Sequence, residues 1–273
     1  MTQNKEFNVL ELKDINWTQK GKQILKDVSW TVEKDQHWVL LGLNGSGKTS
    51  ILKAITGYMW PNKGEVSVLG HKFGQTNIHE LRKSIGWVST SLDERFHNRP
   101  SDTALQIVLS GKNATVGVYD ELTDNDFSRA KELLKQLNID HLSGQLYFTL
   151  SQGEKRKAMI ARALMASPSL LILDEPCNGL DIYSKEELLS TIQSMNKDPD
   201  GPTLIYVTHH IEEVVPSITH AILLHQGVVT ASGKKHEVIT EPKLEETFQV
   251  PLSLQWENER PWIRVKSKSL IEK

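Results

Sequence analysis

The sequence contains a single cysteine, Cys177, among its 273 residues. A disulfide within this chain is therefore excluded, and a chain without disulfides suits a reducing compartment such as the cytosol. An excess of charge of one sign is also lacking, because 32 lysines and arginines are matched by 34 aspartates and glutamates, for a net charge of −2. Without a strong basic field, we expect no direct nucleic-acid partner.

Long apolar runs are lacking as well. A membrane-spanning helix needs about 20 consecutive apolar residues, whereas the longest runs here, such as 169–173, have the length of a strand. Residues 1–14 contain no apolar core, so we expect no secretion signal. We therefore expect that the chain does not cross a membrane by itself, and association with a membrane protein stays open.

Apolar patterning predicts strands that alternate with helices, which is typical of the α/β class. Continuous apolar runs at 38–41 and 170–173 favour strands buried on both faces of a parallel sheet. A helical block is expected to interrupt the sheet between about 92 and 153, with its helix at 126–137 capped by Asp124 or Asn125. Further strands are predicted at 9–15, 28–32, 65–69, 84–89, 203–208, 221–224 and 227–230, and further helices at 49–56, 103–109, 154–166 and 185–195.

The last part of the sequence is more polar. Residues 233–273 nevertheless contain Trp256 and Trp262, and bulky aromatic side chains generally dock on a core. We therefore predict one large domain over residues 1–232, followed by a C-terminal extension over residues 233–273 that packs on it.

A glycine-rich stretch follows the predicted strand at 38–41 and fits the phosphate-loop pattern G-x-x-x-x-G-K-[ST]. Glycines let backbone N–H groups approach phosphate oxygens, and the helix that follows points its positive end at the same charge. Lys48 supplies a mobile catalytic cation for the β- and γ-phosphates of ATP, and the Thr49 hydroxyl can bind Mg²⁺. The predicted nucleotide-binding residues are Gly42, Leu43, Asn44, Gly45, Ser46, Gly47, Lys48, Thr49 and Ser50.

Two acids end a buried strand further along the chain. The apolar run 170–173 leads directly into Asp174 and Glu175. Such a strand can deliver Asp174 to the Mg²⁺ site, where Glu175 would face the γ-phosphate and orient or deprotonate an attacking water. Strands that end in solvated acids are common, so the acidic pair alone is moderate evidence for a nucleotide site. Together with the phosphate loop it is strong evidence. We predict Asp174 as a metal ligand and Glu175 as a catalytic residue.

A third motif, Leu150-Ser151-Gln152-Gly153-Glu154, stands just ahead of a predicted helix. With it, the sequence resembles the ATP-binding-cassette (ABC) ATPases, whose signature is usually written LSGGQ. The resemblance implies that this segment acts in trans, with Ser151 and Gly153 at the γ-phosphate held by a second subunit. Ser151 and Glu154 also fit a simple capping box, and both interpretations can hold together.

The resemblance extends over about residues 7–232. It implies a P-loop NTPase core with a mainly parallel sheet, an antiparallel β-subdomain and an inserted helical subdomain. Asp181 matches a position at the subunit interface, and His209 matches the switch histidine that bonds the γ-phosphate. Trp17 falls near the position where the family stacks an aromatic ring on adenine, although a packed strand aromatic is an equal alternative.

One position departs from the family pattern. The family has a glutamine at the end of the strand that corresponds to 85–89, and that glutamine reaches Mg²⁺ and the attacking water. Thr90 stands there instead. Threonine is shorter and cannot span the same gap, so both the rate of hydrolysis and the coupling to a membrane partner can differ.

Together these motifs predict Mg²⁺-dependent ATP hydrolysis by a homodimer or a paired cassette subunit. One chain carries one phosphate loop and one signature, so two chains are needed to complete two sites. We expect such a dimer to energise an integral-membrane permease on another chain, at the cytoplasmic face of the membrane. The alternative is a soluble ABC ATPase in translation or DNA repair, kept open by Thr90. A kinase is disfavoured, because the signature and the acidic pair would then be unexplained.

Overall fold

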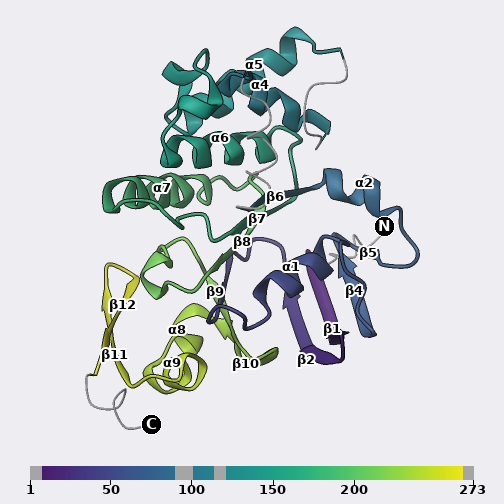
Figure 1. Cartoon of the computed structure of the whole chain (residues 1–273), viewed down its shortest axis with the longest axis vertical. Coiled ribbons are helices and arrows are strands. Elements are labelled where there is room, and N and C mark those ends of the chain that lie inside the picture. Colours follow the sequence, from purple (N-terminus) through teal and green to yellow (C-terminus); the bar gives the residue numbers. More distant parts are fainter. Residues whose placement is uncertain (1–7, 90–100, 114–120, 267–273) are drawn as a thin grey trace, which may run out of the picture. The chain divides into compact units, whose positions relative to one another are not determined.

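A computed structural model describes residues 8–89, 101–113 and 121–266 of the chain (Figure 1). The chain divides into two compact units. One unit comprises residues 1–78 and 203–273, and the other comprises residues 79–202. Thr90 lies outside the described residues.

The first unit contains an antiparallel sheet in the order β2 (Lys22–Val32), β1 (Leu10–Gln19), β4 (Lys63–Val68) and β5 (His71–Lys72). Leu10 of the middle strand lies opposite both Val32 and Val68, and all three side chains are buried. The apolar residues that alternate along these strands therefore form one face, as the period of two predicts. This sheet is the predicted antiparallel part of the fold.

A second sheet in the same unit is mainly parallel. Its strands run in the order β10 (Val228–Lys234), β9 (His220–His225), β3 (Trp38–Leu41) and β8 (Thr203–Thr208). β3 is parallel to both neighbours, whereas β9 and β10, which correspond to the strands predicted at 221–224 and 227–230, form an antiparallel hairpin. All residues of β3 and β8 are buried, which explains their continuous apolar sequence. Helix α1 (Lys48–Ile55) begins after the loop that follows β3.

The C-terminal segment of this unit forms, in chain order, α8 (Lys235–Val238), α9 (Glu241–Phe248) and a hairpin of β11 (Leu252–Glu257) and β12 (Arg260–Val265). α9 packs against β9 and β10, and β12 packs against the 3₁₀ turn η5 (Ile211–Glu213). Trp256 is half-buried, with its ring 4.3 Å from that of His236. Trp262 is 40% exposed, so only the first of the two tryptophans is packed as expected.

The second unit pairs β6 (Ile85–Ser89) with β7 (Leu170–Asp174) in parallel and carries most of the helices. The helices α4 (Ala104–Leu109), α5 (Asp124–Gln136) and α6 (Gln152–Leu164) pack on one another, and α6 also contacts β6 and α7 (Ile182–Met195) (Figure 1). The described part of the unit also contains α2 (Ile78–Lys83, beginning at the unit boundary) and 3₁₀ turns at Ser110–Asn113, Asp140–Leu142 and Tyr147–Thr149.

The cap of α5 differs from the prediction. Thr123, not Asp124 or Asn125, is the N-cap residue, because its backbone is extended and its hydroxyl accepts a hydrogen bond from the Asp126 N–H. The Asp126 carboxylate accepts in return from the Thr123 N–H at 2.8 Å, and both predicted caps lie inside the helix. Hydrogen bonds from Lys112 and Thr123 lower the pKa of Asp126 to about 2. Residues 111–113, which precede this helix in the chain, belong to a 3₁₀ turn.

None of the helices in the described ranges combines the length and the apolar character that crossing a bilayer requires.

Candidate active site

The phosphate loop connects β3 to α1 and is shaped by glycine. A Cβ atom at Gly42 would lie 2.4 Å from the Leu224 carbonyl oxygen, so the backbone of β9 leaves no room for a side chain there. Gly45 and Gly47 have φ angles of +79° and +112°, in the region that favours glycine. The loop geometry therefore favours glycine at both positions that the motif names, Gly42 and Gly47, and also at Gly45, where the motif allows any residue.

Lys48 begins α1 and is only 5% exposed. Its ammonium group donates to the carbonyl oxygens of Gly42 at 2.8 Å and Leu43 at 3.2 Å, so the side chain folds back over its own loop. The Ser46 hydroxyl oxygen is buried and has no hydrogen-bond partner among the described residues. A confined cation beside an unsatisfied hydroxyl and the positive end of a helix suits a phosphate chain.

The fit to a magnesium nucleotide rests on few protein ligands. The described residues hold no group of three or more His, Cys, Asp or Glu side chains that could bind a metal by themselves. Mg²⁺ is usually held by one or two protein ligands together with substrate phosphates and water. The exposed hydroxyl of Thr49, the second residue of α1, and the half-buried carboxylate of Asp174, the last residue of β7, are each a ligand of that kind.

Gly227 supports the phosphate loop, and the sequence motifs did not identify it. It lies in the turn between β9 and β10, and its N–H donates to the Ser46 carbonyl at 2.8 Å. Its own carbonyl accepts from the Lys26 N–H at 2.9 Å, which ties the loop to β2. A Cβ atom here would lie 2.1 Å from the Ile24 carbonyl oxygen, and its φ angle is +81°. The Gln226-Gly227 pair indicates a turn in the sequence, but the contact with the loop is tertiary.

We expect Gly227→Ala to destabilise the protein and to weaken ATP binding. The left-handed backbone costs alanine about 1–2 kcal/mol, and the clash with the Ile24 carbonyl adds to that cost. Gly21→Ala is the matched control, because Gly21 has a φ angle of +77° but no atom within 4 Å of the position that a Cβ atom would take. Denaturant titration and equilibrium ATP binding measure the two effects. Equal losses in both variants would show that the contact with the loop does not matter.

His209 follows β8 at the same sheet edge as the phosphate loop. Thr208 is in register with Leu41, and the two strands are parallel, so the residues after them leave the sheet side by side. The His209 side chain is half-buried, and its ring centroid is 4.1 Å from that of His210. The first unit thus brings the predicted loop and the predicted switch histidine together, while the role of His209 stays a prediction.

Asp174 and Glu175 lie at the carboxyl end of β7 in the second unit. Asp174 is in register with Ser89, the last residue of β6. Both acids are half-buried. Glu175 has a φ angle of +49°, a conformation that is uncommon for residues other than glycine. This conformation is not specific to the site, because Asp14, Leu69 and other non-glycine residues also have positive φ angles.

The signature motif forms the start of α6. The Ser151 hydroxyl accepts from the Glu154 N–H at 3.3 Å, and the Glu154 carboxylate accepts from the Ser151 N–H at 2.7 Å, which confirms the capping box. Ser151 and Gln152 remain exposed at the helix N-terminus. Gly153 is buried, and a Cβ atom there would lie 3.2 Å from the Cβ atom of Ser184 on α7.

Asp181 caps the N-terminus of α7, directly beside that contact. Its carboxylate accepts from the Ser184 N–H at 2.9 Å and from the Ser184 hydroxyl at 3.0 Å. These hydrogen bonds from Ser184 lower the pKa of Asp181 below its usual value. The signature and the predicted interface aspartate therefore form one continuous surface within the second unit.

In the first unit, Trp17 lies on β1 opposite Leu25 and is half-buried.

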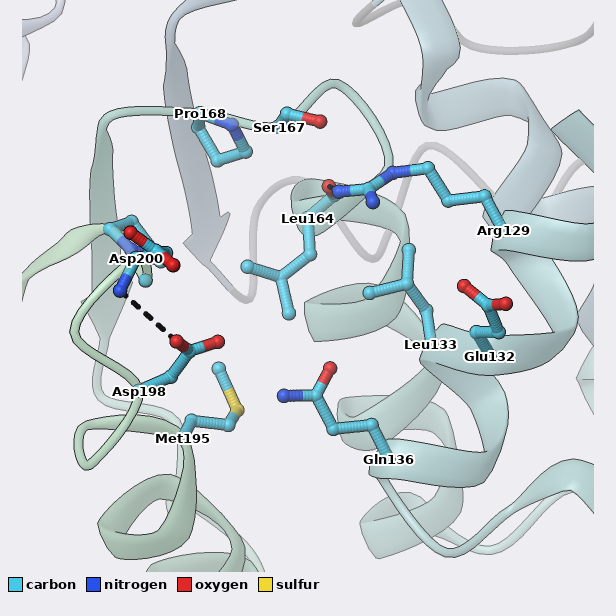
Figure 2. A pocket seen from close by; sticks show the side chains of 12 residues that line it. Arg129, Glu132, Leu133, Gln136, Leu164, Ser167, Pro168, Met195, Asp198 and Asp200 are labelled. Carbon is cyan, nitrogen blue, oxygen red and sulfur yellow. Dashed lines mark hydrogen bonds between the residues drawn. The ribbon is translucent and has the colours of Figure 1, made fainter. Parts of the chain in front are cut away.

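A cavity of about 280 Å³ in the second unit is separate from these residues (Figure 2). It is lined by α5 residues such as Arg129 and by Ser167 and Pro168, which precede β7. Asp174 ends β7, so the cavity and the acids lie at opposite ends of this strand, whose length is about 13 Å at 3.3 Å per residue. Asp198 and Asp200 close its other side, where the Asp200 N–H donates to Asp198 at 3.0 Å (Figure 2). This cavity therefore has no part in the phosphate chemistry.

Comparison with known proteins identifies the family. The family model described as ABC transporter matches residues 25–178, more than half of the chain. The Bacillus subtilis (strain 168) protein named uncharacterized ABC transporter ATP-binding protein YlmA is 44% identical over 256 residues, which cover 93% of this chain and 96% of that protein. The chain belongs to the ABC transporter family. Within it, the chain is an ATP-binding subunit with ATPase activity.

Two solved structures are similar to the chain. One is cbiO1 from Clostridium perfringens, described as part of the ABC transporter complex cbiONQ, with a TM-score of 0.73, 25% identity, and coverage of 88% of this chain and 93% of that one. The other is the dimeric cassette MJ0796, with a TM-score of 0.69, 27% identity, and coverage of 82% and 98%. A further structure of MJ0796 is a dimeric post-hydrolysis state with bound ADP and Pi. The predicted fold class is thus confirmed. His209 and Asp181 lie beyond the residues that the family model matches.

Proposed function

We propose that this chain hydrolyses Mg²⁺-bound ATP in composite sites formed by two copies and that it energises a permease on another polypeptide. The observation that carries the proposal is the number of motifs in one chain. This sequence has one phosphate loop and one signature, and each of them begins a helix. The related cassette MJ0796 is a dimer, also with ADP and Pi bound.

Each predicted site residue has a separate task in this reaction. The amides of the phosphate loop and the Lys48 ammonium hold the β- and γ-phosphates. Thr49 and Asp174 would hold Mg²⁺, which neutralises charge on the phosphate oxygens when it is bound. Glu175 orients the attacking water and accepts its proton, and His209 donates a hydrogen bond to the γ-phosphate. Ser151 and the N-terminus of α6 in the second copy complete the anion site.

ATP would act in this scheme as a removable contact between the two copies. Its γ-phosphate touches the loop of one copy and the signature of the other, so the closed dimer is favoured before hydrolysis and disfavoured after it. This two-state behaviour can drive a conformational change in an attached protein.

A separate permease accounts for two observations together. The chain is an ABC transporter ATP-binding subunit, and the described ranges contain no candidate spanning helix. We place the protein at the cytoplasmic face, where ATP is available. The alternative of a soluble ABC ATPase for translation or DNA repair lacks support, since cbiO1 belongs to a transporter complex. Which compound is moved, and in which direction, depends on the permease.

Affinity purification of the Glu175→Gln protein with ATP tests the partner directly. The variant is expected to retain the closed dimer, so an integral-membrane protein should co-purify in stoichiometric amount from detergent-solubilised membranes. The same purification from cytosol, and a parallel one with the Lys48→Ala protein, serve as controls. Recovery of the Glu175→Gln protein from cytosol alone, with ribosomes, DNA or no partner, would overturn the role in transport. It would favour the soluble alternative that Thr90 keeps open.

A further inference from the structure

The peptide on both sides of His209 is held by one hydroxyl group. Thr208 ends β8 and is 1% exposed. Its hydroxyl accepts from the His210 N–H at 3.0 Å and donates to the Glu213 carboxylate at 2.7 Å. Because Thr208 and His210 flank His209, this hydroxyl fixes the backbone from which the His209 side chain projects.

The acceptor of that bond is a buried acid. Glu213 lies in η5 and is 2% exposed. The same carboxylate oxygen that accepts from Thr208 also accepts from the Tyr206 hydroxyl at 3.0 Å. Thr208 and Tyr206 are two residues apart on β8, so their side chains lie on one face of the strand. Moving η5 away from this face would leave the buried hydroxyls of Tyr206 and Thr208 without this acceptor, which is costly.

The C-terminal hairpin secures η5 from the outside. Arg260, the first residue of β12, donates from Nε to the Glu212 carbonyl oxygen. The Glu212 carboxylate in turn lies 3.3 Å from Nδ1 of His210. The Arg260 guanidinium also lies 4.8 Å from the centre of the Trp262 ring, which restricts its orientation.

A buried lysine anchors the hairpin in place. Lys235 follows β10, and its ammonium group donates to the carbonyl oxygens of Pro216 and Glu259, each at 3.2 Å. Pro216 lies shortly after η5 in the chain, and Glu259 lies in the β11–β12 turn. The hairpin is therefore tied to the chain after η5 as well as to η5 itself, and all of these contacts lie within one compact unit.

We propose that Thr208, Glu213 and Arg260 are positioning residues for His209, and that the C-terminal hairpin braces the loop that presents this histidine to the γ-phosphate. The inference rests on the role proposed above for His209. It gives the described part of the C-terminal extension a function in hydrolysis, although this part carries none of the nucleotide-binding motifs. Loss of the brace lets His209 move, so turnover falls while ATP still binds to the phosphate loop.

Thr208→Val and Thr208→Ser form the first test pair. Valine keeps the shape of the side chain and removes both hydrogen bonds, whereas serine keeps the hydroxyl. A misplacement of about 1 Å can lower a rate by about 10²-fold. We therefore expect kcat of the valine variant to fall by about 10- to 100-fold with an unchanged KM for ATP, and serine to restore most of the rate.

Arg260→Ala tests the hairpin with less disturbance of the buried strand. The loss of one hydrogen bond of about 1 kcal/mol corresponds to a fall of about fivefold in kcat, again without a change in KM. Arg264→Ala is the matched control, because Arg264 is an exposed arginine on the same strand. Thermal unfolding of each variant shows whether the fold is intact.

His209→Ala separates the two proposals. If it is inactive while folded Thr208→Val and Arg260→Ala turn over ATP at the native rate, the brace is refuted and the role of His209 stands. If His209→Ala keeps full activity, the role of His209 fails, and the brace fails with it. A rise in KM without a fall in kcat would also contradict the brace, because it would indicate a defect in ATP binding.

Discussion

Replacement of Glu175 by glutamine is expected to abolish ATP turnover while ATP binding persists. Glutamine has the shape of glutamate and can still bond a water molecule, but it cannot accept the proton that the attacking water loses. A positioned general base contributes about 10²–10⁴-fold to a rate, so kcat should fall by about that factor. The φ angle of +49° at this residue is unaffected by the exchange of one side-chain atom.

Phosphate release in the steady state measures the loss of turnover, and equilibrium binding of ATP measures the retained affinity. Size-exclusion chromatography with and without ATP adds a third readout, because the variant should persist as a dimer only with ATP. Glu80→Gln is a suitable control, since Glu80 is exposed on α2 and forms an ion pair with Lys83 one turn along the same helix. Native turnover by the Glu175→Gln protein would show that another group activates the water, and Thr90 would then need separate study.

The bounds of two buried strands, β3 at Trp38–Leu41 and β8 at Thr203–Thr208, were predictable from the sequence to the residue, because a strand covered on both faces has no polar position in its interior. The third, β7, extends one residue beyond its predicted end, to Asp174. The order of the phosphate loop, the signature and the acidic pair also pointed to the family that the comparisons establish. These features are local in the sequence, which is why a single sequence reveals them.

The features that escaped prediction depend on tertiary contacts or on the backbone angle of one residue. Thr123, Asp124 and Asn125 are all good capping residues, and only the extended backbone at Thr123 selects the first of them. Gly227 looks like an ordinary turn glycine until its N–H is seen to hold Ser46. Glu213 looks like a solvated charge until the fold buries it against β8. Sequence patterns do not indicate which hydrogen-bond partner a residue will find in another part of the chain.

Replacement of Lys48 by alanine is expected to abolish ATP binding itself, in contrast to the change at Glu175. The ammonium group is almost fully buried and already held at the loop by the Gly42 and Leu43 carbonyl oxygens. Little rotamer freedom is therefore lost when it turns to phosphate oxygens. A hydrogen bond to a charged group contributes about 1.5–3 kcal/mol, so each lost contact weakens binding by about 10- to 150-fold.

Equilibrium binding of ATP to the Lys48→Ala protein measures this loss, with Lys53→Ala as the control on the exposed side of the same helix. Thermal unfolding without nucleotide must accompany it, because the variant also loses two hydrogen bonds that order the empty loop. A stable variant with native affinity would mean that the loop amides and the helix terminus suffice for binding. If the Glu175→Gln protein binds ATP without turnover and the Lys48→Ala protein does not bind ATP, hydrolysis is assigned to Glu175 and ATP binding to Lys48 by independent results.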